Sequence, residues 1–188
     1  MNFEKYTEKA QEAVVNAQQN AIRMDQQQVD AEHLALSLVE QEEGLIPRIL
    51  SGMNVSPDAV AGELRREIEK QPKVYGAAAS NVYATRRFNQ VLLAAEETAK
   101  KMKDEYVSVE HLFLALIEER GGFAGTLLKR YGVDSSRFRE ALSKIRGNQR
   151  VTSQNPEMGY QALEKYGRDL VELAQRGKLD PVIGRDSA

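Results

Sequence analysis

The segment Val107-Ser-Val-Glu-His-Leu-Phe-Leu-Ala-Leu-Ile-Glu-Glu119 decides the fold, because the chain carries a copy of it 78 residues earlier, Val29-Asp-Ala-Glu-His-Leu-Ala-Leu-Ser-Leu-Val-Glu-Gln41. Seven positions are identical in the two segments: Val29/Val107, Glu32/Glu110, His33/His111, Leu34/Leu112, Leu36/Leu114, Leu38/Leu116 and Glu40/Glu118. The six residues from Leu112 to Ile117 are all apolar or small, so a helix of this sequence has almost no polar face. A helix that is apolar on all sides is a buried helix. The sequence therefore predicts two buried helices of one design, each at the centre of its own half.

The duplication extends well beyond these two helices. Residues 7–64 align with residues 85–142 without a gap, and 15 of the 58 aligned positions are identical. The short period of a solenoid is absent, so the pattern indicates two fused copies of one small helical unit.

Each unit is predicted to contain four helices. Side chains that can accept hydrogen bonds from the first turn stand where the helices should begin: Thr7, Asp30, Ser56 and, in the second unit, Thr85, Ser108 and Asp134. Pro57 follows Ser56 at a position where its missing N–H costs nothing. The short third helices are expected between Gly44 and Gly52 and between Gly122 and Gly132.

The domain boundaries follow from breaks in this pattern. The sequence predicts a repeat domain over 1–147, with units at about 1–70 and 81–147. A polar, flexible linker is expected over 148–160. Residues 161–188 are expected to be the truncated start of a further module that opens with a helix. The expected fold class is all-α.

Composition narrows the class of protein. With 26 basic and 28 acidic residues the net charge is −2, which disfavours a nucleic-acid platform. The chain has no cysteine, which excludes disulfides and thiolate chemistry. No apolar signal core and no run of about 18 apolar residues is present, so we expect a cytoplasmic protein that does not enter a membrane.

Catalytic and metal-binding patterns are absent from the sequence. His33 and His111 are repeat equivalents, and we interpret each imidazole as a group that caps or packs the start of its buried helix. Neither has a nucleophile at a recognisable spacing, and no set of ligands suits a metal ion. Gly177-Lys178 lacks the rest of a phosphate-binding loop, so this part of the chain is not expected to hydrolyse ATP.

Two further groups of residues are candidates for binding. Glu32 and Glu110 fall in the first turns of the buried helices, where they either answer the helix dipole or, with Thr7 and Asp104, form a polar rim that captures a partner. Val14, Leu92 and Leu93 lie where the two repeats meet. They form either the floor of an apolar groove for unfolded polypeptide or ordinary core.

Several stretches resemble a known family. The duplicated unit with its His-Leu-x-Leu-x-Leu helix resembles the N-terminal domain of the Clp ATPases, which are AAA+ unfoldases. Residues 149–170 are similar to the linker of the ClpB-type disaggregases, and residues 177–186 to the entrance of the first AAA+ module of the whole family. The resemblance implies an all-α domain of two four-helix repeats related by pseudo-twofold symmetry.

The resemblance also implies a function. It implies a substrate-binding region that passes unfolded or aggregated protein to an ATP-driven homohexameric pore. It also implies that the DnaK system takes part. Residues 1–188 by themselves are expected to be monomeric. It places Thr7, Asp104 and Glu110 at positions associated with chaperone activity. It places Val182 and Ile183 against the adenine of ATP in the complete protein.

Two other functions stay open at this stage. One is the adaptor-docking N-domain of a ClpC- or ClpA-type unfoldase that works with a protease, in which Glu32 and Glu110 receive a cationic group of the adaptor. The other is an autonomous enzyme, which the missing nucleophile, metal set and phosphate loop disfavour.

Overall fold

Eight α-helices form the part of the chain that the computed structural model describes, which is residues 3–75, 82–157 and 160. The first repeat contributes α1 (Glu8–Arg23), α2 (Ala31–Val39), α3 (Leu45–Gly52) and α4 (Pro57–Glu69). The second contributes α5 (Arg86–Lys101), α6 (Val109–Glu118), α7 (Phe123–Arg130) and α8 (Ser135–Arg146). A 3₁₀ turn, Phe3–Lys5, precedes α1, and two strands of two residues each, β1 (Gln28–Val29) and β2 (Tyr83–Ala84), are the only strands in these ranges. The predicted all-α class and the two four-helix repeats are confirmed.

The helices begin where the cap residues predicted them. The Thr7 and Thr85 hydroxyls accept the Ala10 and Phe88 N–H groups, each at 3.1 Å. Asp134 accepts the Arg137 N–H at 2.8 Å to open α8, as predicted. These bonds satisfy donors that a helix start otherwise leaves unpaired.

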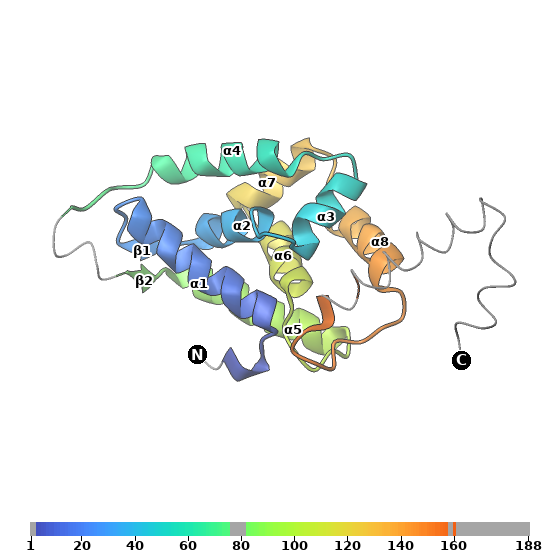
Figure 1. Ribbon diagram of the computed structural model, residues 1–188. Coiled ribbons are helices and arrows are strands. Elements are labelled where there is room, and N and C mark those ends of the chain that lie inside the picture. Colours follow the sequence, from blue (N-terminus) through green and yellow to red (C-terminus); the bar gives the residue numbers. More distant parts are fainter. Residues whose placement is uncertain (1–2, 76–81, 158–159, 161–188) are drawn as a thin grey trace, which may run out of the picture.

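The two duplicated helices lie at the centre of the molecule. All nine residues of α2 are buried, and nine of the ten residues of α6 are buried. Figure 1 shows α2 and α6 inside, with α1, α4 and α5 around them. Burying a Leu or Val side chain contributes about 1.5–3 kcal/mol, so these helices dominate the core.

Each repeat covers the start of the other repeat's buried helix. In one half, β1 pairs in parallel with β2, and the Thr85 N–H donates to the Val29 carbonyl at 3.0 Å. In the other half, Tyr6 forms a parallel bridge with Val107, and the Thr7 N–H donates to the Val107 carbonyl at 2.9 Å. These two arrangements are equivalent under the 78-residue offset. The first turn of α1 therefore lies over the second repeat, and the first turn of α5 over the first.

Two of the predicted groove residues belong to the core instead. Val14 is 2% exposed and Leu92 is 1% exposed, so the prediction that they line an open groove is wrong. Their neighbours along the helices face solvent, with Val15 at 47% and Leu93 at 61%. Successive residues of a helix are rotated by about 100°, and this step turns Val15 and Leu93 out of the buried face that holds Val14 and Leu92.

The segment after α8 turns back onto the domain. In Figure 1 it runs from α8 to the start of α1. Val151 is fully buried, its carbonyl accepts the Glu105 N–H at 2.8 Å, and the Gln154 carbonyl accepts the Glu8 N–H at 2.9 Å. The prediction of a flexible linker over 148–160 therefore does not hold for residues 150–157. In this segment the backbone groups of Val151 and Gln154 have specific partners, which the periodicity of the side chains does not reveal. The helix expected from 161 and the residues Val182 and Ile183 lie outside the described residues.

No helix in the described ranges is long and apolar enough to cross a membrane.

Candidate functional site

Buried polar side chains gather at the starts of α2 and α6, around His33 and His111. We call the cluster at α2 site one; it consists of Gln26, Asp30, Glu32, His33, Thr85 and Arg87. We call the cluster at α6 site two; it consists of Thr7, Asp104, Ser108, Glu110, His111 and Arg146. Equivalent positions differ by 78 residues, so the two sites can be compared atom by atom.

Both histidines cap their own helices, as predicted. The Nδ1 atoms of His33 and His111 accept the Asp30 and Ser108 N–H groups, each at 2.9 Å. An accepting Nδ1 carries no proton, so each Nε2 carries it and donates to the residue seven positions earlier. Both imidazoles are therefore neutral and fully buried. In site one, burial lowers the pKa of His33 to about 4.

In site one the neutral Gln26 satisfies the histidine, and Arg87 satisfies the buried glutamate. His33 Nε2 donates to Gln26 Oε1 at 2.7 Å, and Gln26 Nε2 donates to the Ile68 carbonyl at 2.7 Å. The glutamine thus satisfies a donor and an acceptor without any charge. Glu32 receives two hydrogen bonds from Arg87, at 2.8 and 3.2 Å. Burial raises the pKa of Glu32 and the Arg87 hydrogen bonds oppose that shift.

Arg87 belongs to α5 and ties the two repeats together. Besides Glu32 it contacts Asp30 at 3.3 Å and Glu119 at 2.8 Å. Its hydrogen bonds to Glu119 and Glu32 raise the pKa of its guanidinium, which stays charged. The first repeat's acidic helix start is therefore filled by a side chain of the second repeat.

Site two carries charge where site one is neutral. Asp104 replaces Gln26, and Arg146 replaces Ile68. His111 Nε2 donates to Asp104 Oδ2 at 2.7 Å, and Arg146 forms ion pairs with Asp104 and with Glu110, the latter at 3.3 Å. Although burial alone raises it, the hydrogen bonds from His111, the Val151 N–H and Arg146 hold the pKa of Asp104 below its ordinary value.

The segment after α8 completes site two. The Val151 N–H donates to Asp104 Oδ1 at 2.9 Å, and Arg146 Nε donates to the Gln149 carbonyl at 2.8 Å. Glu157 reaches further in: its Oε2 accepts the Thr7 hydroxyl at 2.8 Å and the Val109 N–H at 3.3 Å. With Glu157, three buried carboxyl groups meet at site two, and the guanidinium of Arg146 contacts two of them, Asp104 and Glu110.

At site two, the surroundings raise the pKa of the Glu157 carboxyl well above its ordinary value. Burial, and then the charge of Glu110, raise the pKa of Glu157 to about 7, against the opposing hydrogen bonds from Thr7 and Val109. The Oε1 atoms of Glu110 and Glu157 have no hydrogen-bond partner among the described residues. A proton on Glu157 therefore relieves a repulsion that the ionised pair would suffer.

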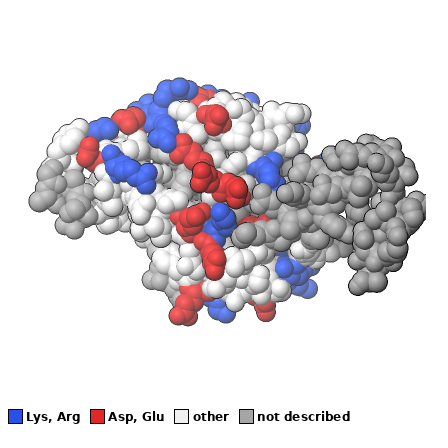
Figure 2. Space-filling model, in the orientation of Figure 1, with Lys and Arg blue, Asp and Glu red and all other residues white. Residues whose placement is uncertain are grey.

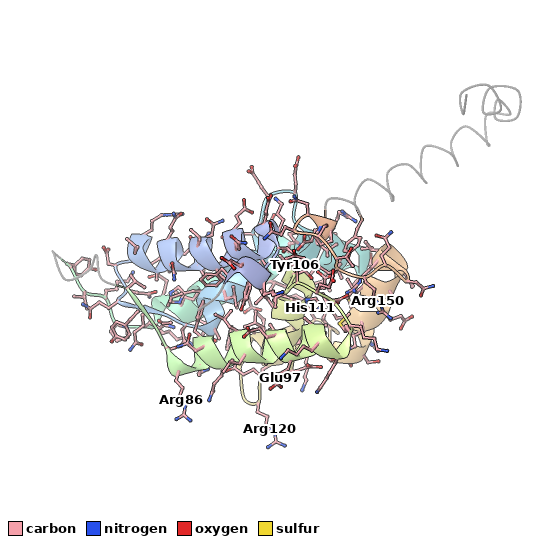
Figure 3. The ribbon with its side chains drawn as sticks, turned by 90° about the horizontal axis from the view of Figure 1, so that it is seen from below. Arg86, Glu97, Tyr106, His111, Arg120 and Arg150 are labelled. Atoms are coloured by element: carbon pink, nitrogen blue, oxygen red, sulfur yellow. The ribbon has the colours of Figure 1, made fainter. Side chains whose placement is uncertain are left out.

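The structure brings the predicted residues Thr7, Asp104 and Glu110 together and buries all three. Thr7 and Glu110 are 0% exposed and Asp104 is 8% exposed, so they do not form an open rim. Sequence reasoning missed Arg146 and Glu157. The aligned repeats held a signal for the first of them, because the change from Gln26 to Asp104 accompanies the change from Ile68 to Arg146. Figure 3 shows His111 inside the molecule, near the segment that carries Arg150.

The surface offers a second pair of equivalent features, between the first and second helices of each repeat. The pocket between α5 and α6 has a volume of about 120 Å³ and is lined by Val91, Ala94, Ala115, Gln90, Glu118 and Glu119. Of its apolar residues Ala94 is exposed, whereas Val91 and Ala115 are buried and present only a small part of their surface. Its counterpart between α1 and α2, about 320 Å³, has Asn16 and Ser37 where the second repeat has Ala94 and Ala115, while Val91 corresponds to the buried Ala13. The second repeat therefore presents the more apolar pocket.

Charges of both signs are distributed over the surface. Figure 2 shows acidic and basic side chains interspersed on the described part of this face, without a large basic patch. No group of three or more His, Asp or Glu residues within 3–75, 82–157 and 160 is placed to hold a metal ion.

Comparisons with known proteins agree on one family. The model of the Clp repeat (R) N-terminal domain matches residues 5–130 and 108–178. The chain is 50% identical over 190 residues to the chaperone protein ClpB of Nitratidesulfovibrio vulgaris and 45% identical over 188 residues to that of Clostridium tetani. These matches cover 100% and 99% of this chain but 22% of each relative, so the chain spans about a fifth of their length.

Solved structures show the same fold. The Hsp104 N-terminal domain of Candida albicans matches with a TM-score of 0.70 at 20% identity, over 81% of this chain and 99% of that chain. The N-terminal domain of the ClpV1 ATPase of Escherichia coli matches with a TM-score of 0.63 at 20% identity, over 73% of this chain and 83% of that one.

Proposed function

The chain belongs to the Clp repeat (R) N-terminal domain family, and from this premise we propose that it is the substrate-binding N-terminal region of an ATP-dependent ClpB-type chaperone. In this proposal it contacts unfolded or aggregated polypeptide in the cytoplasm and delivers it to the rest of a homohexameric ATPase. The DnaK system works beside it, and stress-denatured proteins are the substrates.

One observation carries the proposal: the identity of 50% extends over the whole chain and places it within the first fifth of a ClpB chaperone. ATP binding belongs to the complete protein. Val182 and Ile183, outside the described residues, remain our proposal for the contact with adenine.

The geometry of the two sites favours this function over docking of a cationic adaptor. Such docking needs an open carboxylate at Glu32 or Glu110. Arg87 already binds Glu32, Arg146 already binds Glu110, and the two carboxylates are 5% and 0% exposed. At Glu110 a cationic partner would have to displace a buried ion pair, which costs several kcal/mol, and at Glu32 it would have to displace the partly exposed Arg87.

The apolar pocket between α5 and α6 is the place that we propose for substrate contact. An unfolded chain exposes apolar side chains, and a shallow apolar depression binds them weakly without strict sequence preference. Leu93, at 61% exposure on the same helix, adds apolar surface beside it. Thr7, Asp104 and Glu110 are too deeply buried to touch a substrate, so in this proposal they support chaperone activity from inside the fold.

Nuclear magnetic resonance titration of the chain with an unfolded model protein tests this proposal. We expect shifts at Val91, Ala94 and Ala115, and none at the equivalent residues of the polar pocket. Ala94→Asn gives the second repeat the residue of the first, and we expect it to weaken binding several-fold. The matched exchange Asn16→Ala serves as control and should leave that binding unchanged. Shifts confined to other surfaces, or equal binding by Ala94→Asn, would refute the proposed substrate site.

A further inference from the structure

Site two is incomplete without the chain that follows α8. Asp104 accepts its third hydrogen bond from the Val151 N–H, and Thr7 donates its hydroxyl to Glu157. Both Val151 and Glu157 are buried, at 0% and 4% exposure. Site one needs no such addition, because Gln26 and Arg87 close it from within the repeats.

The docked segment is held by its backbone at two points. Val151 bonds the 104–105 loop through its N–H, at 2.9 Å to Asp104, and through its carbonyl, at 2.8 Å from Glu105. Three residues later the Gln154 carbonyl accepts the N–H of Glu8. On release each of these backbone groups exchanges its protein partner for water, so a segment held by a few such bonds can dock and be released.

The titratable and charged groups around Glu157 come from several elements. Glu110 and His111 belong to α6, Asp104 to the loop before it, Arg146 to α8, and the buried phenol of Tyr160 follows Glu157 in the chain. Arg146 already pairs with Asp104 and Glu110, so an ionised Glu157 adds a negative charge that no further ion pair offsets. The neutral carboxyl keeps an acceptor oxygen for Thr7 and Val109 and adds no charge.

We propose that residues 150–157 are a latch whose docking site is site two, and that the proton on the Glu157 carboxyl decides whether this latch is docked or free. Docked, it fixes the repeat domain against the chain that follows. When the latch is free, Tyr160 leaves the core with it, and the ten residues 148–157 become a tether that reaches up to about 35 Å. This inference concerns the attachment of the domain and does not depend on the proposed substrate.

The direction of the pH effect follows from linkage. Docking raises the pKa of Glu157 from its ordinary 4.5 to about 7. Below about 4.5 the carboxyl is protonated in both states and docking is strongest. As the pH rises toward 7, the free latch ionises while the docked latch resists, so the docking equilibrium falls by up to about tenfold per pH unit. Above about 7 the loss is complete.

Distance measurements between spin labels test this proposal directly. The chain has no cysteine, so Thr152→Cys on the latch and Lys101→Cys on α5, both exposed, give a unique labelled pair. We expect a narrow distance distribution at pH 5.5 and a broad one at pH 8. The pair Gln18→Cys and Lys101→Cys, within the repeats, should give the same narrow distribution at both pH values.

Two further variants separate the carboxyl from general effects of pH. Glu157→Gln keeps the acceptor oxygen without the charge, and its latch distribution should stay narrow at pH 8. Glu105→Gln neutralises an exposed carboxylate beside the same segment and should broaden like the parent chain. An unchanged parent distribution between pH 5.5 and 8, or broadening in Glu157→Gln, overturns the proposal. The parent pH series decides the matter even if Glu157→Gln fails to fold.

Discussion

Site one and site two lie at the starts of two equivalent helices, and in each a histidine caps the helix. The two sites differ in the side chains that satisfy the buried hydrogen-bonding groups around that histidine. In site one the Gln26 amide bonds His33 and the Ile68 carbonyl, so the partner of the imidazole is uncharged. In site two the same position holds Asp104, and Arg146 stands where Ile68 stood. The two sites therefore have the same backbone arrangement and differ by a paired substitution, at Gln26/Asp104 and at Ile68/Arg146.

This difference decides which site is completed by the two repeats alone. A buried amide can satisfy its neighbours in both directions, whereas a buried carboxylate requires donors. Asp104 takes these donors from His111, Arg146 and the backbone of Val151, which lies outside the repeats. The charged solution therefore connects the second repeat to the chain that follows it.

Removing the buried cation should give the largest effect. Arg146→Met leaves the buried Asp104 and Glu110 without a positively charged partner, and we expect a loss of about 3–5 kcal/mol in the free energy of unfolding at pH 7. Urea denaturation at pH 7 and pH 5 measures it. The loss should shrink at pH 5, because the pKa of the buried Asp104 rises once the arginine that lowers it is gone.

The equivalent position in the first repeat provides the control. Ile68→Ala removes apolar contacts and should cost about 2–5 kcal/mol, with a cost that is the same at both pH values. An Arg146→Met loss below about 1 kcal/mol, or one independent of pH, would contradict the role given to this arginine.

Copying site one into site two should reveal that the exchanged pair acts together. The variants Asp104→Gln and Arg146→Ile each break the ion pair, and the double variant restores the combination found at Gln26 and Ile68. We expect the double variant to be more stable than the sum of the single losses by about 1–3 kcal/mol. A double-mutant cycle by urea denaturation measures this coupling. Strict additivity would show that the two positions are independent.

Much of this frame could be predicted from the sequence, because it depends on local rules. The cap residues Thr7, Asp30 and Asp134 mark helix starts through bonds to residues three positions away or nearer. The apolar run of α6 predicts its burial, and the 78-residue offset predicts the second copy.

The contacts that complete the sites could not be predicted in the same way. Arg87 meets Glu32 across 55 residues, and Glu157 meets Thr7 across 150. The residues that surround Arg87 and Glu157 in the sequence do not distinguish these two side chains from charged side chains that face solvent. Whether Leu92 or Leu93 faces inward likewise depends on the rotation of α5 against α6, which fixes the first at 1% and the second at 61% exposure.

Site one should respond less to the loss of its arginine than site two. Arg87→Gln removes the pairing of Glu32, but the Arg87 side chain is 39% exposed and solvent screens it. We therefore expect a cost of about 1–2 kcal/mol, measured by thermal unfolding at pH 7. Its neighbour Arg86 points away from the molecule in Figure 3, so Arg86→Gln should change stability by less than about 0.5 kcal/mol. Equal effects of the two substitutions would contradict the assignment of Arg87 as the closing group.

The two capping threonines should give the smallest and most closely matched pair of effects. Thr7→Val and Thr85→Val each remove a helix cap, at about 1 kcal/mol. Thr85 also donates to Asp30 at 2.7 Å, and Thr7 also donates to Glu157 at 2.8 Å. Thermal unfolding should therefore show similar losses, whereas amide exchange at Val151 should accelerate in Thr7→Val alone. Acceleration in both variants would show that the latch does not depend on Thr7.

Amide hydrogen exchange from pH 5.5 to pH 8, corrected for the intrinsic rate, tests most directly whether the second repeat alone is closed by a releasable segment. The N–H of Thr85, bonded to Val29, reports on site one, and the N–H groups of Val151 and Glu8 report on the latch. We predict that Thr85 keeps the protection of the whole fold at every pH. Val151 and Glu8 should lose much of theirs between pH 5.5 and about 7. A common, pH-independent protection for all three amides would contradict the account.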